Sequence, residues 1–128
     1  MRTFTLYLLL LILGLLPACR APIKNARTTE VVINGNCDMC EENIETAALM
    51  EGVSEVDWDK DTRHATITYD SARTSVNAVL QRIANAGYDN QAFIAPDSAY
   101  QELPLCCRYE RTGKVVNPPT PDDTRHAH

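Results

Sequence analysis

The chain has 128 residues, of which 45% are apolar, 23% charged and 6% aromatic, a balance typical of one small globular domain. Its net charge is −5 at neutral pH, from 12 Lys and Arg against 17 Asp and Glu. Because binding to a phosphate backbone needs a basic face, this acidic balance argues against nucleic acid as a partner. Five cysteines are many for a chain of this size, so we expect its function to depend on sulfur chemistry.

Residues 1–18 have the pattern of a signal peptide. The apolar run over residues 4–16 falls short of the roughly 20 residues that span a bilayer, but it fits the hydrophobic region of an export signal. The following Leu-Pro-Ala-Cys, residues 16–19, resembles a bacterial lipobox, in which the cysteine is acylated and becomes the new N-terminus. We therefore expect Cys19 to be a lipid anchor and residues 19–27 to be a tether. The alternative is an ordinary secretory peptide that leaves Cys19 unmodified.

The mature chain alternates between strand-like and helix-like patterns. Turn-forming residues and changes in apolar spacing mark the boundaries. The predicted elements are, in chain order, a strand over residues 29–33, a helix over 40–50, a hairpin of strands over 56–58 and 64–70, a helix over 76–86 with Thr74 or Ser75 as its cap, and a strand over 91–94. This βαββαβ order predicts the α+β class and a ferredoxin-like sandwich, with two helices on one face of a four-stranded antiparallel sheet. Trp58 and Phe93 should lie in its core.

The pattern weakens after the last predicted strand. Residues 96–112, the C-terminal extension, contain a segment that can form one or two helical turns, followed by the neighbouring pair Cys106 and Cys107. Residues 113–128 are rich in proline and poor in apolar residues, so we expect a disordered tail.

The segment Asn-Gly-Asn-Cys-Asp-Met-Cys, residues 34–40, joins the first predicted strand to the first helix. Two cysteines three positions apart at a helix start can direct both sulfurs at one ion, and the helix dipole favours their thiolate forms. Thiolates select soft ions, and two of them suffice for a two-coordinate ion, whereas a structural zinc site has four ligands. We therefore predict that Cys37 and Cys40 bind a metal, with Cu(I) favoured and Hg(II), Zn(II) and Cd(II) as alternatives.

Residues 28–95 resemble the heavy-metal-associated domain, the fold of copper chaperones and of the periplasmic mercury-binding protein. The matching segments are Gly-x-Cys-x-x-Cys at 35–40, Gly-Val at 52–53, Ile-Thr-Tyr-Asp at 67–70 and Ala-Gly-Tyr-Asp at 86–89. The resemblance implies that Cys37 and Cys40 bind the metal and that Tyr88 lies near the metal loop. The chain departs from the family pattern at Gly35, where the family usually has a methionine that packs beneath the loop.

Cys106 and Cys107 lie outside this domain, on a segment that resembles an extension of other exported proteins of the family. About 12 residues separate them from the last predicted strand, enough for the chain to return to the metal loop. They can then supply additional metal ligands, form a disulfide with Cys37 or Cys40 in an oxidising compartment, or simply be buried. Met39, between the two loop cysteines, is a soft ligand near the metal loop, although a loop methionine more often faces solvent or a partner.

The resulting functional hypothesis is a metal chaperone or scavenger. We expect an exported, membrane-anchored lipoprotein, on the periplasmic side or at the outer membrane, that passes a soft ion to a metal-transport or efflux protein by thiolate exchange. It should act as a monomer and not as an enzyme, since no bond in a substrate is broken. The alternatives are a thiol-disulfide oxidoreductase that uses the same CxxC, and a structural lipoprotein stapled by disulfides.

Overall fold

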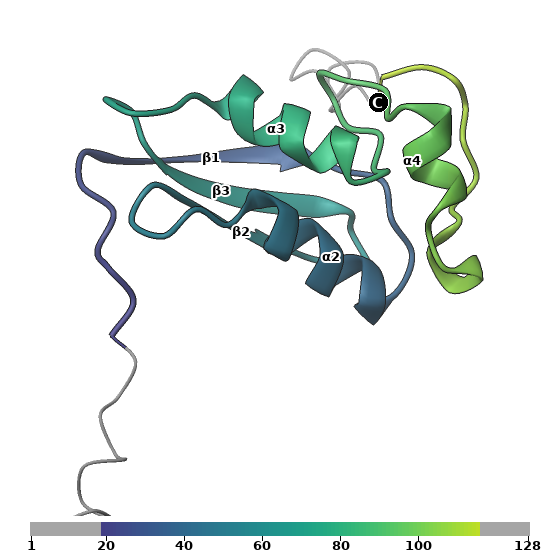
Figure 1. The fold of residues 1–128 in the computed structure, drawn as a ribbon, viewed down its shortest axis with the longest axis horizontal. Helices are drawn as coiled ribbons and strands as arrows, with labels where there is room; N and C mark the ends of the chain where they lie inside the picture. Colours follow the sequence, from purple (N-terminus) through teal and green to yellow (C-terminus); the bar gives the residue numbers. More distant parts are fainter. Residues whose placement is uncertain (1–18, 116–128) are drawn as a thin grey trace, which may run out of the picture.

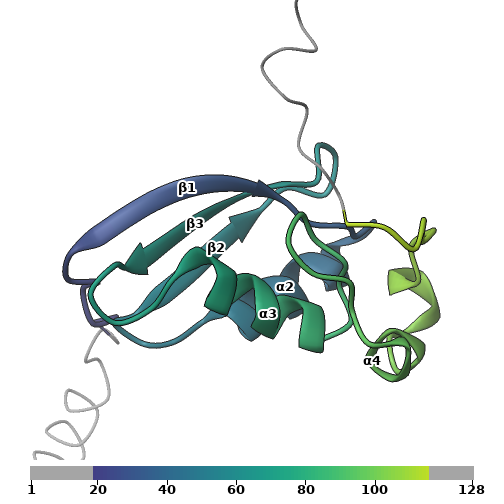
Figure 2. The ribbon, with the colours of Figure 1, turned by 90° about the horizontal axis from the view of Figure 1, so that it is seen from above.

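The computed structural model describes residues 19–115. The predicted signal peptide and most of the predicted tail lie outside the described residues. The elements are β1 (Ala26–Val32), α2 (Asp38–Ala48), β2 (Ser54–Trp58), β3 (His64–Asp70), α3 (Val76–Asn85), α4 (Asp97–Gln101) and the short 3-10 helix η1 (Leu105–Cys107). Helices α2 and α3 lie side by side on one face of the sheet, as Figures 1 and 2 show, so the predicted α+β class with helices on an antiparallel sheet is confirmed.

The sheet has the strand order β1-β3-β2, with both neighbouring pairs antiparallel. The predicted hairpin forms β2 and β3, and its alternating pattern puts Val56, Trp58, Ala65 and Ile67 into the core. Strand β1 pairs with β3 from Ala26 onward, so it begins inside the segment predicted as a tether. The sheet therefore extends closer to Cys19 than the sequence pattern indicates.

The structure corrects the prediction of a fourth strand over residues 91–94: the described sheet has three strands. Instead, Asn90 forms an isolated antiparallel bridge with Ile33. The Asn90 side-chain oxygen then accepts hydrogen bonds from the backbone N–H groups of Ala92 and Phe93, at 3.1 and 3.0 Å. Such an asparagine turn bends the chain away from β1 directly after the bridge. Phe93 consequently lies half-buried beside the core, not within it as predicted.

The two long helices follow their sequence signals, with shifted ends. Helix α2 starts and ends two residues before the predicted positions, because Leu49 is already extended (φ −68°, ψ 120°). Helix α3 is capped by Ser75, whose side-chain oxygen accepts a hydrogen bond from the Ala78 N–H at 3.2 Å. Gly87 follows α3 with φ 109°, a conformation that glycine adopts without strain.

Trp58 supports the loop that carries the first two cysteines. The side chain is only 1% exposed, and its indole N–H donates a hydrogen bond to the Ile33 carbonyl at 3.0 Å. A Cβ added to Gly35 would lie 2.8 Å from two carbons of the Trp58 ring. The tryptophan ring thus leaves no room for a side chain at position 35.

The C-terminal extension folds against the end of the helical layer, where the loop from β1 enters α2 (Figure 1). It contributes Leu103, Cys107 and Tyr109 to the buried core. None of the helices within residues 19–115 is long and apolar enough to cross a lipid bilayer.

Candidate metal centre

Cys37 and Cys40 meet at the start of α2. Cys37 is the N-cap residue, with an extended backbone (φ −151°, ψ 168°), and its carbonyl accepts hydrogen bonds from the N–H groups of Cys40 and Glu41. This turn places the two sulfurs 3.1 Å apart, with Cys37 half-buried and Cys40 fully buried. Both therefore lie at the positive end of the α2 dipole, which favours thiolates.

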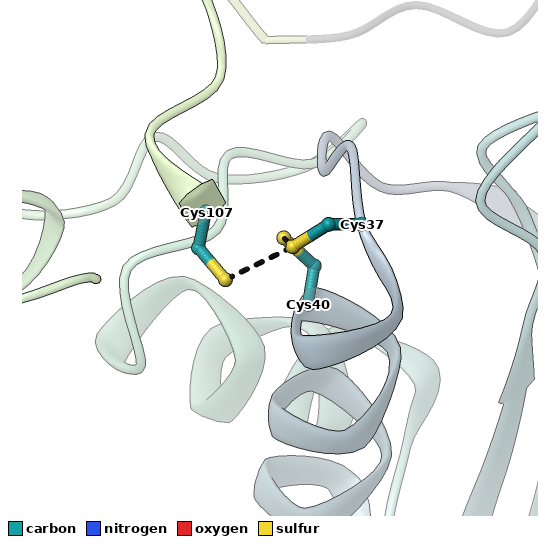
Figure 3. Close-up of side chains that lie close together, drawn as sticks. All are labelled: Cys37, Cys40 and Cys107. Carbon is teal, nitrogen blue, oxygen red and sulfur yellow. Dashed lines mark hydrogen bonds between the residues drawn. The ribbon is translucent and has the colours of Figure 1, made fainter. Parts of the chain in front are cut away.

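A third thiol joins them from the C-terminal extension. The Cys107 sulfur lies 3.3 Å from that of Cys37, and Figure 3 shows it pointing from η1 towards the two loop cysteines. All three sulfurs lie within 4.8 Å of one another. We call Cys37, Cys40 and Cys107 the three-thiol cluster. It joins a segment after β1 to a segment 70 positions further along the chain.

The spacing of the three-thiol cluster suits one soft cation. Metal–sulfur bonds in zinc thiolate sites are about 2.3 Å long, and three sulfurs around one ion at that distance lie about 4 Å apart. The Cys37 sulfur lies 3.1 Å from that of Cys40 and 3.3 Å from that of Cys107, and all three lie within 4.8 Å of one another, so small side-chain movements would admit an ion. Three thiolates form a donor set that discriminates strongly against hard cations.

The three-thiol cluster does not include Cys106. This neighbour of Cys107 is exposed, whereas Cys107 is fully buried, so the two side chains diverge as expected for adjacent residues. The Cys106 sulfur lies 4.0 Å from the Cys107 sulfur and 3.9 Å from the Met39 sulfur. Cys19, the predicted lipid anchor, is exposed and precedes β1.

The thiols of the cluster differ in acidity. Burial acts to raise the pKa of Cys37, but hydrogen bonds from the thiols of Cys40 and Cys107 and from the Cys40 backbone bring this pKa below its ordinary value. Burial, followed by the closeness of the other two thiols, raises the pKa of Cys107. Cys37 therefore forms a thiolate more readily than Cys107, whose proton a bound cation must displace.

Two polar side chains surround the cluster. Tyr88 is fully buried, its hydroxyl accepts a hydrogen bond from the Asn43 amide at 3.0 Å, and it lies within hydrogen-bonding reach of Cys107. Asn36 accepts a hydrogen bond from the Cys40 thiol at 3.3 Å. Neither asparagine was singled out from the sequence. The signal for Asn43 is its spacing from Cys40, since residues three apart share one face of a helix.

Tyr109 and Arg111 attach the extension to the turn after α3. The Tyr109 hydroxyl donates to the Gly87 carbonyl at 2.8 Å and accepts from the Asp89 N–H at 2.7 Å. Arg111 pairs with the buried Asp89 carboxylate. These contacts were not predicted from the sequence, although Cys107, Tyr109 and Arg111 alternate as residues on one face of an extended segment do.

Comparisons with known proteins identify the family of this chain. Residues 31–89 match the family model of the heavy-metal-associated domain. The "Mercuric transport protein periplasmic component" of Pseudomonas aeruginosa is 38% identical to this chain over 76 residues, which are 57% of this chain and 84% of that protein. The protein of the same name from Alcaligenes sp is 36% identical, with the same coverage of both chains. The crystal structure of oxidized MerP from Ralstonia metallidurans CH34 aligns at 36% identity and a TM-score of 0.46, over 51% of this chain and 93% of that one. The chain belongs to the heavy-metal-associated domain family.

Proposed function

We propose that this chain binds Hg(II) as its cargo through Cys37, Cys40 and Cys107 and passes the ion to a membrane transport protein. The observation that carries the proposal is the convergence of three thiols within 4.8 Å, two from the CxxC loop and one from the extension. Soft thiolates are the ligands that such an ion prefers, and a mobile cargo needs no closed four-ligand cage.

The names of the relatives change which ion we propose as the cargo. The sequence motif favoured Cu(I), but the matched relatives are named as mercuric transport proteins. Hg(II) is therefore the first ion to test, and Cu(I) is the competitor. Both are soft, so the family and the donor atoms alone do not separate them.

Thiolate exchange is the transfer step that suits this site. An incoming thiolate of the acceptor adds to the bound ion, and one thiolate of the cluster then leaves. Cys37 is the contact point for this exchange, because it is half-buried while its two partners are buried. The ion changes ligands without a change of oxidation state, so we propose a carrier and not an enzyme. A periplasmic position, with a lipid on Cys19 holding a monomer near its transport partner, completes the proposal.

The experiment is a titration of the reduced, full-length chain under anaerobic conditions, because a disulfide cannot bind the ion. Hg(II) and Cu(I) are offered separately against competing chelators, and X-ray absorption counts the sulfur neighbours of the bound ion. We expect one Hg(II) per chain with three sulfur neighbours, and two after Cys107→Ser. Cys19→Ser, outside the cluster, is the matched control.

Two results would contradict the proposal. If Cys37→Ser or Cys40→Ser left the affinity for Hg(II) unchanged, the ion would not bind at the cluster. If the wild type bound Cu(I) tightly but lost Hg(II) to a simple thiol, the cargo would be copper.

A further inference from the structure

A second pair of sulfurs lies outside the three-thiol cluster. The Cys106 thiol approaches the Met39 thioether at 3.9 Å. Both residues are exposed, Met39 to 45%. Each directly precedes a member of the cluster in the sequence, Met39 before Cys40 and Cys106 before Cys107, so the backbone that places the cluster also places this pair. We call Met39 and Cys106 the entry pair.

The entry pair connects the surface to the buried thiols. The Cys106 sulfur is 4.0 Å from the Cys107 sulfur, which in turn is 3.3 Å from the Cys37 sulfur. Cys40 and Cys107 have no exposed surface, so a bulky mercury complex cannot approach them directly. Successive sulfurs about 4 Å apart allow an ion to bond to the next sulfur before it leaves the previous one.

We propose that the entry pair captures Hg(II) from a small-molecule thiol complex and hands it to the three-thiol cluster. The inference rests on the proposed function, because it assumes that the cluster is the destination. Met39 suits a temporary role: its thioether is soft but neutral, so it adds contact with the ion without competing with three thiolates.

The exchange balances without an oxidant. Hg(II) arrives bonded to two small thiolates, RS–Hg–SR. The Cys106 thiolate forms a bond to the ion, one Hg–SR bond breaks, and the departing RS⁻ takes up the proton that Cys106 released. Cys107 then bonds to the ion, and the second RS⁻ leaves with the Cys107 proton.

Cys37 and Cys40 complete the transfer. They bond to the ion as Cys106 leaves; one of their protons returns to Cys106 and the other goes to solvent. Mercury stays Hg(II) throughout, and no electrons are exchanged.

A temporary ligand has a kinetic signature that a permanent one lacks. It lowers the free-energy barrier between free and bound ion, which loading and release both cross. Its removal should therefore slow loading and release equally and leave the affinity for Hg(II) unchanged. The probe is the Hg(II) complex with two cysteine molecules, mixed in a stopped-flow instrument with the reduced full chain. The ultraviolet thiolate-to-mercury absorbance follows loading, and an excess of a dithiol chelator follows release.

The variants are Cys106→Ser and Met39→Leu, both at exposed positions, with Cys19→Ser as the matched control. For Cys106→Ser we expect loading and release to slow by about tenfold each at unchanged affinity, because the most exposed thiol is lost and the mercury complex must then react at the half-buried Cys37. Met39→Leu keeps the volume and should slow both by about threefold, since only a weak ligand is removed. Cys19→Ser should match the wild type.

Wild-type rates in Cys106→Ser would overturn the inference. So would a loss of affinity together with one fewer sulfur neighbour, because Cys106 would then be a permanent ligand. These outcomes leave the proposed function intact. A wild type that binds no Hg(II), or a Cys37→Ser variant that binds it normally, would instead overturn the proposed function and the inference with it.

Discussion

Arg111 forms two hydrogen bonds with the Asp89 carboxylate, from Nε at 2.9 Å and from Nη2 at 2.8 Å. The Asp89 side chain is 1% exposed and that of Arg111 16%. The hydrogen bonds to Asp89, opposed by burial, raise the pKa of Arg111, so it stays charged at any pH at which the protein folds. A bidentate, largely buried ion pair of this kind fixes both the distance and the relative orientation of the two side chains.

The pair determines where Cys107 lies. Asp89 belongs to the turn that follows α3 and is the last residue matched by the family model, whereas Arg111 lies on the C-terminal extension. Arg111 also donates to the Ala95 carbonyl at 2.7 Å, so it closes the extension into a loop against the domain. Contacts between the extension and the turn after α3 therefore help to hold the third thiol beside the CxxC loop.

Asp89→Asn should destabilise the fold much more than Asp97→Asn. Both carboxylates bind Arg111, but the Asp97 side chain is 86% exposed. Asp89→Asn removes the buried charge that pairs with Arg111 and leaves only the exposed Asp97, at a cost of about 3 kcal/mol of unfolding free energy, while the exposed pair contributes less than about 1 kcal/mol. Urea denaturation of the two variants measures the difference. Equal losses would show that Asp89 does not anchor the extension.

Alkylation should separate the cysteines by burial. Without metal, Cys106 and Cys37 should react first with iodoacetamide, since Cys106 is exposed and Cys37 is half-buried with a lowered pKa. The buried Cys40 and Cys107 should react last. One equivalent of Hg(II) should protect the three-thiol cluster and leave Cys106 reactive, as peptide mass spectrometry would show. Protection of Cys106 in place of Cys107 would contradict the assignment.

Gly35→Ala should strain the loop that presents the cysteines. The new methyl group would lie 2.8 Å from the Trp58 ring and 3.2 Å from the Cys40 Cβ, and the ring is too buried to move aside. Overpacking of this kind costs about 1–3 kcal/mol of unfolding free energy. The double variant Gly35→Ala with Trp58→Phe should lose less than the sum of the single variants, because phenylalanine lacks the clashing carbons. Strictly additive losses in thermal or urea unfolding would rule out this contact.

The sequence predicts the elements and the CxxC loop because their signals are local. Alternation identifies β2 and β3, and an apolar stripe identifies α3. The strand predicted over residues 91–94 has the same kind of local signal, but the Asn90 side chain satisfies the backbone there and turns the chain. Periodicity does not report such side-chain contacts, so the fourth strand could not be excluded from sequence.

Likewise, the tertiary structure and not the local sequence determines whether Cys106 or Cys107 faces the loop. The two residues are adjacent in the chain and have the same side-chain chemistry. The choice depends on how η1 is rotated against α2, and the contacts of Tyr109 and Arg111 with the turn after α3 set that rotation. Those partners lie 22 residues away in the chain, beyond the reach of any local pattern.

Tyr88 lies where it can tune the third thiol. Its hydroxyl lies within hydrogen-bonding reach of Cys107, and a hydrogen bond to that thiol opposes the effect of burial, which raises the pKa of Cys107. Burial likewise raises the pKa of Tyr88 itself, so the hydroxyl keeps its proton and remains a donor at neutral pH. A thiol must lose its proton to bind a metal, so any change that raises the pKa of Cys107 weakens metal binding at a pH below that value.

Tyr88→Phe should therefore weaken Hg(II) binding without preventing the fold. Loss of one hydrogen bond to a thiolate corresponds to about 1 kcal/mol, or roughly fivefold in affinity. The deficit should persist across the neutral range, since Cys107 is protonated there before the metal binds. Competition titrations at several pH values measure it, with Tyr69→Phe as the control, because Tyr69 lies towards the Asp70 end of β3, away from the loop that follows Val32. An equal loss in Tyr69→Phe, or none in Tyr88→Phe, would show that the hydroxyl does not act on Cys107.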